Sequence, residues 1–193
     1  MQFSCAILAG GAGRRFGGSV KSKLVIGGRT IISRILETVE PVFDEKIIVT
    51  NTPGEFTGSG HLKVVGDQFV RHGPLAGIHA ALKNSESDFV FVIAGDMPFL
   101  DRDLIRLQIA EFDKLPCEAL IPEIGGLIEP LHAIYSKSVA DRIEAFFAAG
   151  KSLAIRDLLP ELDVRYLEME LSENTKRAFT NINIPGDLEK LDS

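Results

Sequence analysis

The sequence has few cysteines, fewer basic than acidic residues, and no long hydrophobic run. Among its 193 residues only Cys5 and Cys117 are cysteines, which excludes a disulfide framework and a zinc site with four cysteine ligands. Lys and Arg number 21 against 27 Asp and Glu, and the net charge of −6 gives no general reason to bind nucleic acid or an anionic membrane. No apolar stretch approaches the roughly 20 residues that cross a bilayer. The apolar start, residues 3–9, has no basic flank or cleavage signature of a signal peptide.

These absences predict a soluble, reduced, cytoplasmic protein that binds neither nucleic acid nor membrane. What is present is the composition of a globular protein, with 45% hydrophobic and 25% charged residues. A chain of this length suits one α/β domain. We therefore expect a single domain over residues 1–193.

Apolar strand patterns alternate with amphipathic helix patterns along the chain. Strands are expected at 3–9, 46–50, 62–65, 88–94, 119–121, 131–135 and 164–167, and helices at 31–39, 73–82, 101–112, 138–149 and after 185. This alternation predicts right-handed crossovers and a mainly parallel sheet between two helical layers, which is a three-layer αβα, Rossmann-like fold. In such folds ligands bind at the carboxyl edge of the strands.

A glycine-rich loop follows the first expected strand. Residues 8–18 read LAGGAGRRFGG, and Lys21 comes just after them. Glycines let backbone N–H groups approach an anion, and Arg14, Arg15 and Lys21 add positive charge, so the segment is typical of a phosphate-binding loop. It does not continue into the Lys-Ser/Thr pair of a Walker A motif, and Phe16 occupies the third glycine position of a dinucleotide-binding fingerprint. The simpler interpretation is a flexible turn with solvated arginines.

Two aspartates follow expected strands. Asp96 comes after the most apolar strand, where one carboxylate together with substrate phosphates can bind a hard cation such as Mg²⁺. Asp67 follows the short strand at 62–65 and is a candidate acceptor for a base or a ribose. The helix that starts at Gly73 places further backbone donors at the same edge. The simpler interpretation of both aspartates is a turn residue.

These motifs, in this order, resemble those of the molybdenum cofactor guanylyltransferases, which share the nucleotidyltransferase fold with the sugar-phosphate nucleotidylyltransferases. The resemblance covers the whole chain. It is carried by LAGGxxxRFGGxxK at 8–21, GPLAG at 73–77, DMP at 96–98 and NINIP at 181–185. The glycine loop marks the wider superfamily, whereas the second and fourth motifs point to the guanylyltransferases.

The resemblance also implies roles for residues that match the family's motifs. Leu8, Ala9 and Gly10 would line the nucleotide. Lys21 would contact its phosphates, and Arg15 would stabilise charge during transfer. Asp67 would bind the nucleotide, and Asp96 would bind both nucleotide and Mg²⁺. Asn181 and Asn183 would lie near the pterin acceptor.

The chain departs from the family pattern at two places. Val20 stands where the family often has aspartate before the loop lysine. The asparagine expected after the second strand is either replaced by Thr50 or shifted to Asn51. Lys23 also competes with Lys21 as the phosphate lysine, although the spacing to the following helix favours Lys21.

The resemblance implies a Mg²⁺-dependent transfer of GMP from GTP to the phosphate of molybdenum-molybdopterin, with release of pyrophosphate. GTP and the molybdopterin cofactor would then be the partners, with transient contact to other cofactor-biosynthesis proteins. Two alternatives stay open. One is a sister nucleotidyltransferase that uses CTP or another phosphate acceptor, and the other is a non-catalytic nucleotide-binding regulator. His132 is interpreted either as a core histidine or as part of the acceptor pocket.

Overall fold

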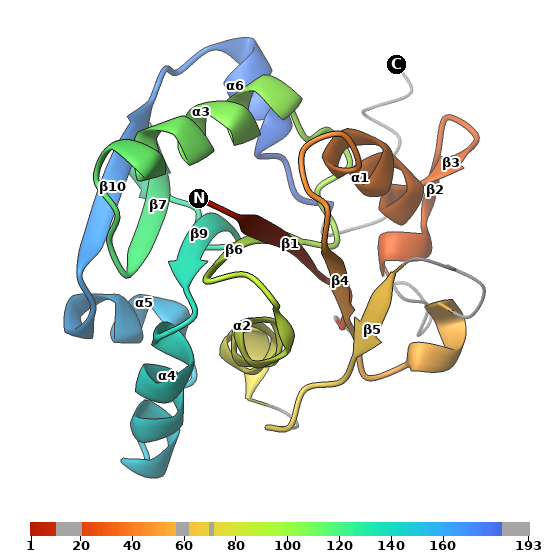
Figure 1. Ribbon diagram of the computed structural model, residues 1–193. Helices are drawn as coiled ribbons and strands as arrows, with labels where there is room; N and C mark the ends of the chain where they lie inside the picture. Colours follow the sequence, from red (N-terminus) through yellow and green to blue (C-terminus); the bar gives the residue numbers. More distant parts are fainter. Residues whose placement is uncertain (11–20, 57–61, 70–71, 183–193) are drawn as a thin grey trace.

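The structure is a computed structural model that describes residues 1–10, 21–56, 62–69 and 72–182. The strands of its main sheet are β1 (Phe3–Leu8), β4 (Lys46–Val49), β5 (Lys63–Val65), β6 (Phe89–Ala94), β7 (Ala119–Ile124), β8 (Leu127–Ile128), β9 (His132–Ser136) and β10 (Val164–Met169). Their order is β10-β7-β9-β6-β1-β4-β5, and β8 pairs with β7 (Figure 1). A separate hairpin joins β2 (Val25–Ile26) and β3 (Arg29–Thr30).

The central strands run parallel and β9 runs against them. β4 is parallel to both β1 and β5, β1 is parallel to β6, and β10 is parallel to β7. β9 is antiparallel to its neighbours β6 and β7. The expected mainly parallel sheet is therefore confirmed. Because β9 is reversed, its amino end lies at the edge where β6 has its carboxyl end.

Helices cover both faces of the sheet (Figure 1). One face carries α1 (Ile31–Val39), α3 (Arg102–Lys114) and α6 (Glu173–Ala178), and the other carries α2 (Gly73–Asn84), α4 (Val139–Ala148) and α5 (Ile155–Leu158). Short 3-10 helices, η2 (Lys21–Lys23), η3 (Pro53–Phe56) and η4 (Leu159–Glu161), complete the described elements. The β2–β3 hairpin, β8, α5, α6 and the 3-10 helices are additions to the elements expected from sequence, and all are six residues or shorter. The helix expected after residue 185 lies outside the described residues.

Two of the expected helix starts are confirmed by side-chain caps. The Thr30 hydroxyl accepts a hydrogen bond from the Ser33 N–H at 3.2 Å, and the Asp101 carboxylate accepts from the N–H groups of Asp103 and Leu104 at 2.8 and 3.1 Å. Each bond satisfies a donor that the first turn of a helix leaves unpaired. Proline at position 74 occupies the first turn of α2, where its missing N–H costs nothing.

The central strands are apolar throughout because both of their faces are covered. On β6, Phe91 and Ile93 pack under α1 and α3, while Val90 and Val92 pack under α2 and α4. All four side chains are fully buried. A strand buried on both sides has no polar alternation, which is why the sequence shows continuous apolar runs here. None of the helices in the described ranges is long and apolar enough to cross a membrane.

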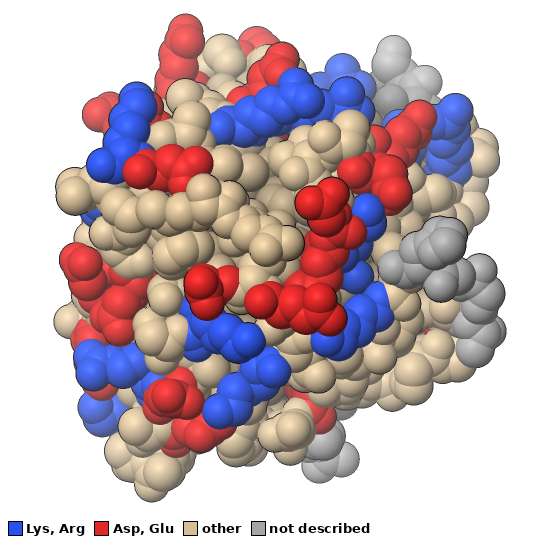
Figure 2. Space-filling model, viewed as in Figure 1, with Lys and Arg blue, Asp and Glu red and all other residues tan. Residues whose placement is uncertain are grey.

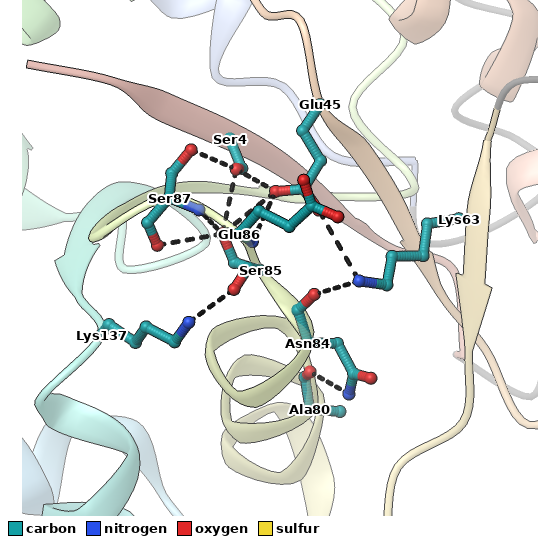
Figure 3. A network of polar contacts seen from close by, with 9 residues as sticks. All are labelled: Ser4, Glu45, Lys63, Ala80, Asn84, Ser85, Glu86, Ser87 and Lys137. Carbon is teal, nitrogen blue, oxygen red and sulfur yellow. Dashed lines mark hydrogen bonds and ion pairs between the residues drawn. The ribbon is translucent and has the colours of Figure 1, made fainter.

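A buried polar network closes the amino edge of the sheet, opposite the edge where parallel strands bind ligands (Figure 3). The Glu45 carboxylate accepts hydrogen bonds from the hydroxyls of Ser4 and Ser85 and from the Glu86 N–H. Partial burial raises the pKa of Glu45, but these bonds and the charge of Lys63 outweigh burial, so the pKa lies below its ordinary value. The network thus joins the ends of β1, β4 and β6.

The same network holds the carboxyl end of α2 (Figure 3). Lys63 donates to the Asn84 carbonyl at 2.5 Å, and Lys137 donates to the Ser85 carbonyl at 2.6 Å. Cations are favourable at a helix carboxyl end because the last carbonyls point there unpaired. With this end anchored, the amino end of α2 is directed to the carboxyl edge of the sheet.

Charged side chains on the viewed face are mixed in sign (Figure 2). Among the described residues, exposed ion pairs include Lys151 with Glu161 at 2.5 Å and Lys83 with Glu144 at 3.0 Å. Exposed pairs of this kind contribute little to stability.

His132 belongs to the core rather than to an exposed pocket wall. It is fully buried, and its ring packs against Phe91 and Phe179 with centroids 5.1 and 4.5 Å apart. The Gln108 side-chain amide donates to His132 Nδ1 at 3.0 Å, so the neutral ring carries its proton on Nε2. Burial lowers the pKa of His132 from 6.5 to about 4. Of the two interpretations of this residue, the structure supports the core histidine.

Protonation of His132 is expected to destabilise the protein in mild acid. Between pH 6.5 and about 4 the unfolded chain binds a proton at this residue that the folded chain does not. Stability attributable to His132 is therefore present above pH 6.5 and falls by roughly 3 kcal/mol as the pH drops from 7 to 4. Denaturant unfolding at a series of pH values measures this loss.

The matched control is the double variant His132→Phe with Gln108→Leu, which removes both hydrogen-bonding partners together and so leaves neither unpaired. Its free energy of unfolding is expected to fall less between pH 7 and pH 4 than that of the wild type. Equal losses in the two proteins would show that His132 does not titrate in the way its burial implies.

Candidate active site

Asp96 and Lys21 form an ion pair at the carboxyl end of β6. Lys21 Nζ lies 2.9 Å from Asp96 Oδ2, and the two side chains are 22% and 21% exposed. Lys21 belongs to η2, which follows the glycine-rich loop, and Asp96 lies two residues after β6. The fold thus brings together two predicted site residues 75 positions apart. The pair is half-buried, so both charges remain accessible to a ligand at this edge.

Gly95 fixes the position of Asp96 against β1. Its N–H donates to the Leu8 carbonyl at 3.0 Å, and a β-carbon at Gly95 would lie 2.8 Å from that oxygen and 3.1 Å from the Ala9 Cα. These are backbone atoms of a central strand, so they cannot move aside cheaply. Only glycine fits here, and the close approach holds the next residue, Asp96, beside the end of β1.

Leu8, Ala9 and Gly10 lie at the centre of the same edge. The Leu8 carbonyl and the Ala9 N–H are used by the sheet, since they pair with Gly95 and Val49. The Leu8 side chain packs against Gly77 in the first turns of α2, where an added β-carbon would lie 3.3 Å from it. The backbone at Leu8 and Ala9 is therefore held rigidly by the sheet. Gly10 is exposed, and it is the last residue of the glycine-rich loop that the structure describes.

Asp67 lies at the far side of this edge and is held by Asn51. Asn51 Nδ2 donates to Asp67 Oδ2 at 2.8 Å, and the Asp67 N–H donates back to Asn51 Oδ1 at 3.2 Å. Thr50, the other candidate for the expected asparagine position, is 1% exposed, and its hydroxyl accepts a hydrogen bond from the Thr52 N–H. Of the two residues, Asn51 is therefore the one whose side chain contacts Asp67.

Helix α2 begins at this edge as the sequence predicted. Gly73 has a positive φ of 64°, which glycine adopts without strain, and Pro74 follows it in the first turn. The first turn contains no acidic residue. The positive end of the helix dipole is thus not offset by a carboxylate of its own first turn.

Asn181 contacts a residue that sequence reasoning did not select. Its side chain donates a hydrogen bond to the Glu129 carboxylate, and the next residue, Ile182, donates its N–H to the Asp96 carbonyl at 2.9 Å. Burial raises the pKa of Glu129, and the charge of Asp96 raises it further, against hydrogen bonds from Leu131 and Asn181. Glu129 thus lies in the electrostatic field of Asp96.

The sequence shows that Glu129 precedes an apolar strand, but its place at this edge depends on the direction of that strand. In a parallel strand that position would be at the opposite edge from Asp96. Because β9 is antiparallel to β6, the residues before it lie beside the residues after β6. An acidic residue just before a reversed strand is therefore a site candidate.

Other predicted residues lie elsewhere or outside the described ranges. Lys23 points to η3, where Nζ lies 3.5 Å from Glu55 Oε2 and 5.4 Å from the centroid of the Phe56 ring. Arg15, Val20 and Asn183 lie outside the described residues, so their predicted roles stay predictions. No cluster of three or more metal-ligating side chains occurs within the ranges that the structure describes.

The chain is similar in sequence to proteins of one family along almost its whole length. The family described as "MobA-like NTP transferase domain" matches residues 5–165. A probable molybdenum cofactor guanylyltransferase of Natranaerobius thermophilus is 36% identical, with 97% of this chain and 93% of the relative covered. The molybdenum cofactor guanylyltransferase of Desulfosudis oleivorans is also 36% identical, with the same coverage.

Solved structures agree with the sequence relatives. Molybdopterin-guanine dinucleotide biosynthesis protein A from Archaeoglobus fulgidus superposes with a TM-score of 0.80 at 31% identity, covering 97% of this chain and 96% of that one. The 2-C-methyl-D-erythritol 4-phosphate cytidylyltransferase of Thermus thermophilus has a TM-score of 0.72 at 16% identity, covering 100% of this chain and 98% of that one, and so shares the fold. With both the sequence and the structural similarity extending over the whole edge that carries Asp96 and Lys21, the chain belongs to the molybdenum cofactor guanylyltransferase family of MobA-like NTP transferases.

Proposed function

We propose that this protein transfers GMP from GTP to the phosphate of molybdenum-molybdopterin in the cytoplasm, within one nucleotidyltransferase domain over residues 1–193. The observation that carries the proposal is the Lys21–Asp96 pair, 2.9 Å apart, at the carboxyl edge of a sheet whose relatives are named guanylyltransferases. A cytoplasmic location is supported by the two free cysteines, Cys5 and Cys117. Transient contact with other cofactor-biosynthesis proteins is part of the proposal.

The residues at Asp96 fit a magnesium ion. One half-buried carboxylate is available there, and the described residues supply no cluster of three ligands. Mg²⁺ is commonly held in this way, by one or two carboxylates together with substrate phosphates and water. Asp96 would hold the ion. A bound Mg²⁺ would supply positive charge to the phosphate oxygens.

The remaining residues position the substrates and balance charge. The acceptor phosphate oxygen attacks the α-phosphorus of GTP, the bond to the bridging α–β oxygen breaks, and pyrophosphate leaves with the electron pair. Lys21 offsets negative charge on the triphosphate, and Arg15 has the same role by family resemblance. Such transfers depend on positioning and electrostatics rather than on a protein nucleophile. Cys5 is fully buried, and burial raises its pKa well above the ordinary value, which makes it unsuitable as a nucleophile.

The acceptor side of the proposal rests on Asn181 and Glu129. Asn181 is tied to Asp96 through the backbone of its neighbour Ile182 and to Glu129 through its side chain. A pterin carries several N–H donors and ring acceptors, and an amide next to a carboxylate pairs with both kinds. Asn183 would extend this surface by family resemblance.

GTP is expected to be the preferred nucleotide. Guanine offers N1–H and N2–H₂ donors to an acceptor such as the Asp67 carboxylate, whereas adenine lacks this donor pair and would leave a buried acceptor unpaired at about 1–3 kcal/mol. Cytosine has a different edge and a smaller ring, so it loses contacts as well as packing.

Pyrophosphate release with each of the four nucleoside triphosphates, with and without molybdopterin cofactor, tests the proposal. Release with GTP that requires the cofactor is the expected result. Faster release with CTP would assign the protein to a cytidylyl-transferring branch. Binding of GTP without any release would favour the non-catalytic regulator.

A further inference from the structure

The loop between β6 and α3, residues 95–101, carries Asp96 and is fixed at both of its ends. At its start the Gly95 N–H donates to the backbone of β1. At its end Asp101 Oδ1 caps the first turn of α3. Phe99, between these ends, is half-buried and belongs to neither a strand nor a helix. The course of the loop between its ends therefore depends on what packs against Phe99.

A distant part of the chain, the α6 segment (residues 173–182), contacts both ends of this loop. Asn174 Nδ2 donates to Asp101 Oδ2 at 2.7 Å, which is the carboxylate oxygen that the α3 cap does not use. The Ile182 N–H donates to the Asp96 carbonyl at 2.9 Å. The α6 segment therefore follows the loop from its last residue back to Asp96.

Between these two contacts Arg177 covers the middle of the loop. Its guanidinium carbon lies over the Phe99 ring, 4.7 Å from the ring centroid. A guanidinium in this position is attracted by the negative face of the ring, and its planar shape stacks well there. Arg177 is exposed, so its charge stays in water while the side chain covers the ring. The contact thus holds the part of the loop that neither end fixes.

The α6 segment also carries a residue of the acceptor side. Asn181 donates to the Glu129 carboxylate, and its neighbour Ile182 is bonded to the Asp96 backbone. A shift of the α6 segment would therefore displace Asn181 and the backbone of Asp96 together. The contacts of α6 with the loop thus connect the acceptor side of the site to the residue that would hold the metal ion.

We propose that Arg177 is a positioning residue for the transfer reaction, which holds the loop through Phe99 and so keeps the Asp96 carboxylate in one position. The proposal rests on the guanylyl-transfer function given above. Arg177 acts through the ring and need not touch substrate or metal. A reacting group displaced by about 1 Å can lose much of its catalytic effect, so a looser loop lowers the rate without unfolding the protein.

Amide hydrogen exchange tests the contact without any substrate. Peptides that cover residues 95–101 are followed by mass spectrometry in the wild type, Arg177→Ala and Arg177→Lys. Lys176→Ala is the matched control, because it removes the same charge from the neighbouring position, where Lys176 pairs with Glu173 of α6 itself at 2.6 Å. Thermal unfolding of each variant verifies that it is folded.

The loop is expected to exchange about two- to fivefold faster in Arg177→Ala, the range that corresponds to loss of an exposed cation–aromatic contact. Arg177→Lys keeps a cation that can lie over the ring and is expected to stay within about twofold of the wild type. Lys176→Ala is expected to leave the exchange of the loop unchanged.

Two further measurements separate positioning from a merely structural contact. Binding of Mn²⁺ in the presence of GTP, followed by electron paramagnetic resonance, is expected to weaken about two- to fivefold in Arg177→Ala. At saturating Mg²⁺, kcat is expected to fall about tenfold while KM for GTP stays within about twofold. In the Phe99→Leu background, Arg177→Ala is expected to have almost no further effect on either quantity, because its target is gone.

Equal exchange rates of the loop in the wild type and Arg177→Ala would overturn the proposal, as would additive effects of Arg177→Ala and Phe99→Leu. Faster exchange with unchanged kcat and Mn²⁺ binding would show a structural contact only and would also overturn it. Failure of the guanylyl-transfer function is a different result, in which the wild type itself would release no pyrophosphate from GTP whatever the exchange rates of the loop.

Discussion

Replacing Asp96 with alanine is expected to abolish turnover while the protein stays folded. The carboxylate is the acidic group paired with Lys21 and the residue that would hold the metal ion. Its loss removes charge stabilisation of several kcal/mol from the reacting phosphates, which corresponds to a rate loss on the order of a thousandfold or more. Pyrophosphate release at saturating GTP and Mg²⁺ measures the effect.

A second readout separates loss of the metal from loss of the fold. Binding of Mn²⁺ in the presence of GTP, followed by electron paramagnetic resonance, is expected to weaken in Asp96→Ala and in the isosteric Asp96→Asn. Asp88→Ala is the matched control, because it removes an exposed carboxylate at the opposite end of β6. Turnover of Asp96→Ala near the wild-type rate at saturating Mg²⁺ would contradict the metal assignment.

Replacing Lys21 with alanine is expected to lower kcat/KM for GTP by about tenfold to a hundredfold. A charge-assisted contact to phosphate is worth roughly 1.5–3 kcal/mol, which corresponds to this range. The substitution also leaves the half-buried Asp96 carboxylate without its cation. Steady-state kinetics with GTP as the varied substrate gives both kcat and KM.

Lys23→Ala serves as the comparison, since it removes the same charge two residues away. Lys23 interacts with Glu55 and the Phe56 ring on η3, so its replacement is expected to change kcat/KM much less. If Lys23→Ala were the more damaging variant, the phosphate lysine would be Lys23. If both substitutions changed kcat/KM only slightly, neither lysine would be the phosphate-binding residue.

The order of strands and helices was readable from sequence because each central strand is buried on both faces. Continuous apolar runs such as Phe89–Ala94 exist only where the sheet is covered by helices on two sides, and Thr30, Asp101 and Pro74 marked helix starts through local chemistry. The same local signals placed Asp96 directly after a buried strand. Such features depend on neighbours within a few positions, so the chain alone carries them.

Contacts between side chains that are far apart in the sequence could not be predicted from such local patterns. Lys21 and Lys23 differ by two positions, yet only the docking of η2 onto the carboxyl edge directs Lys21 to Asp96 and Lys23 to Glu55. The choice between Thr50 and Asn51 depended on the β4–β5 register, which buries Thr50 and sets Asn51 against Asp67. A one-residue difference reverses which side chain faces the site.

Glu129 illustrates the same limit at the other end of the edge. Local patterns show that a strand follows it, but a strand pattern is the same in both directions. The reversed insertion of β9 between β6 and β7 brings Glu129 to the carboxyl edge of β6, where Asn181 donates to it and the charge of Asp96 acts on it. Local residue chemistry thus defined which elements form and which side chains are reactive, whereas strand direction and register, set by contacts between distant segments, defined which of those side chains meet.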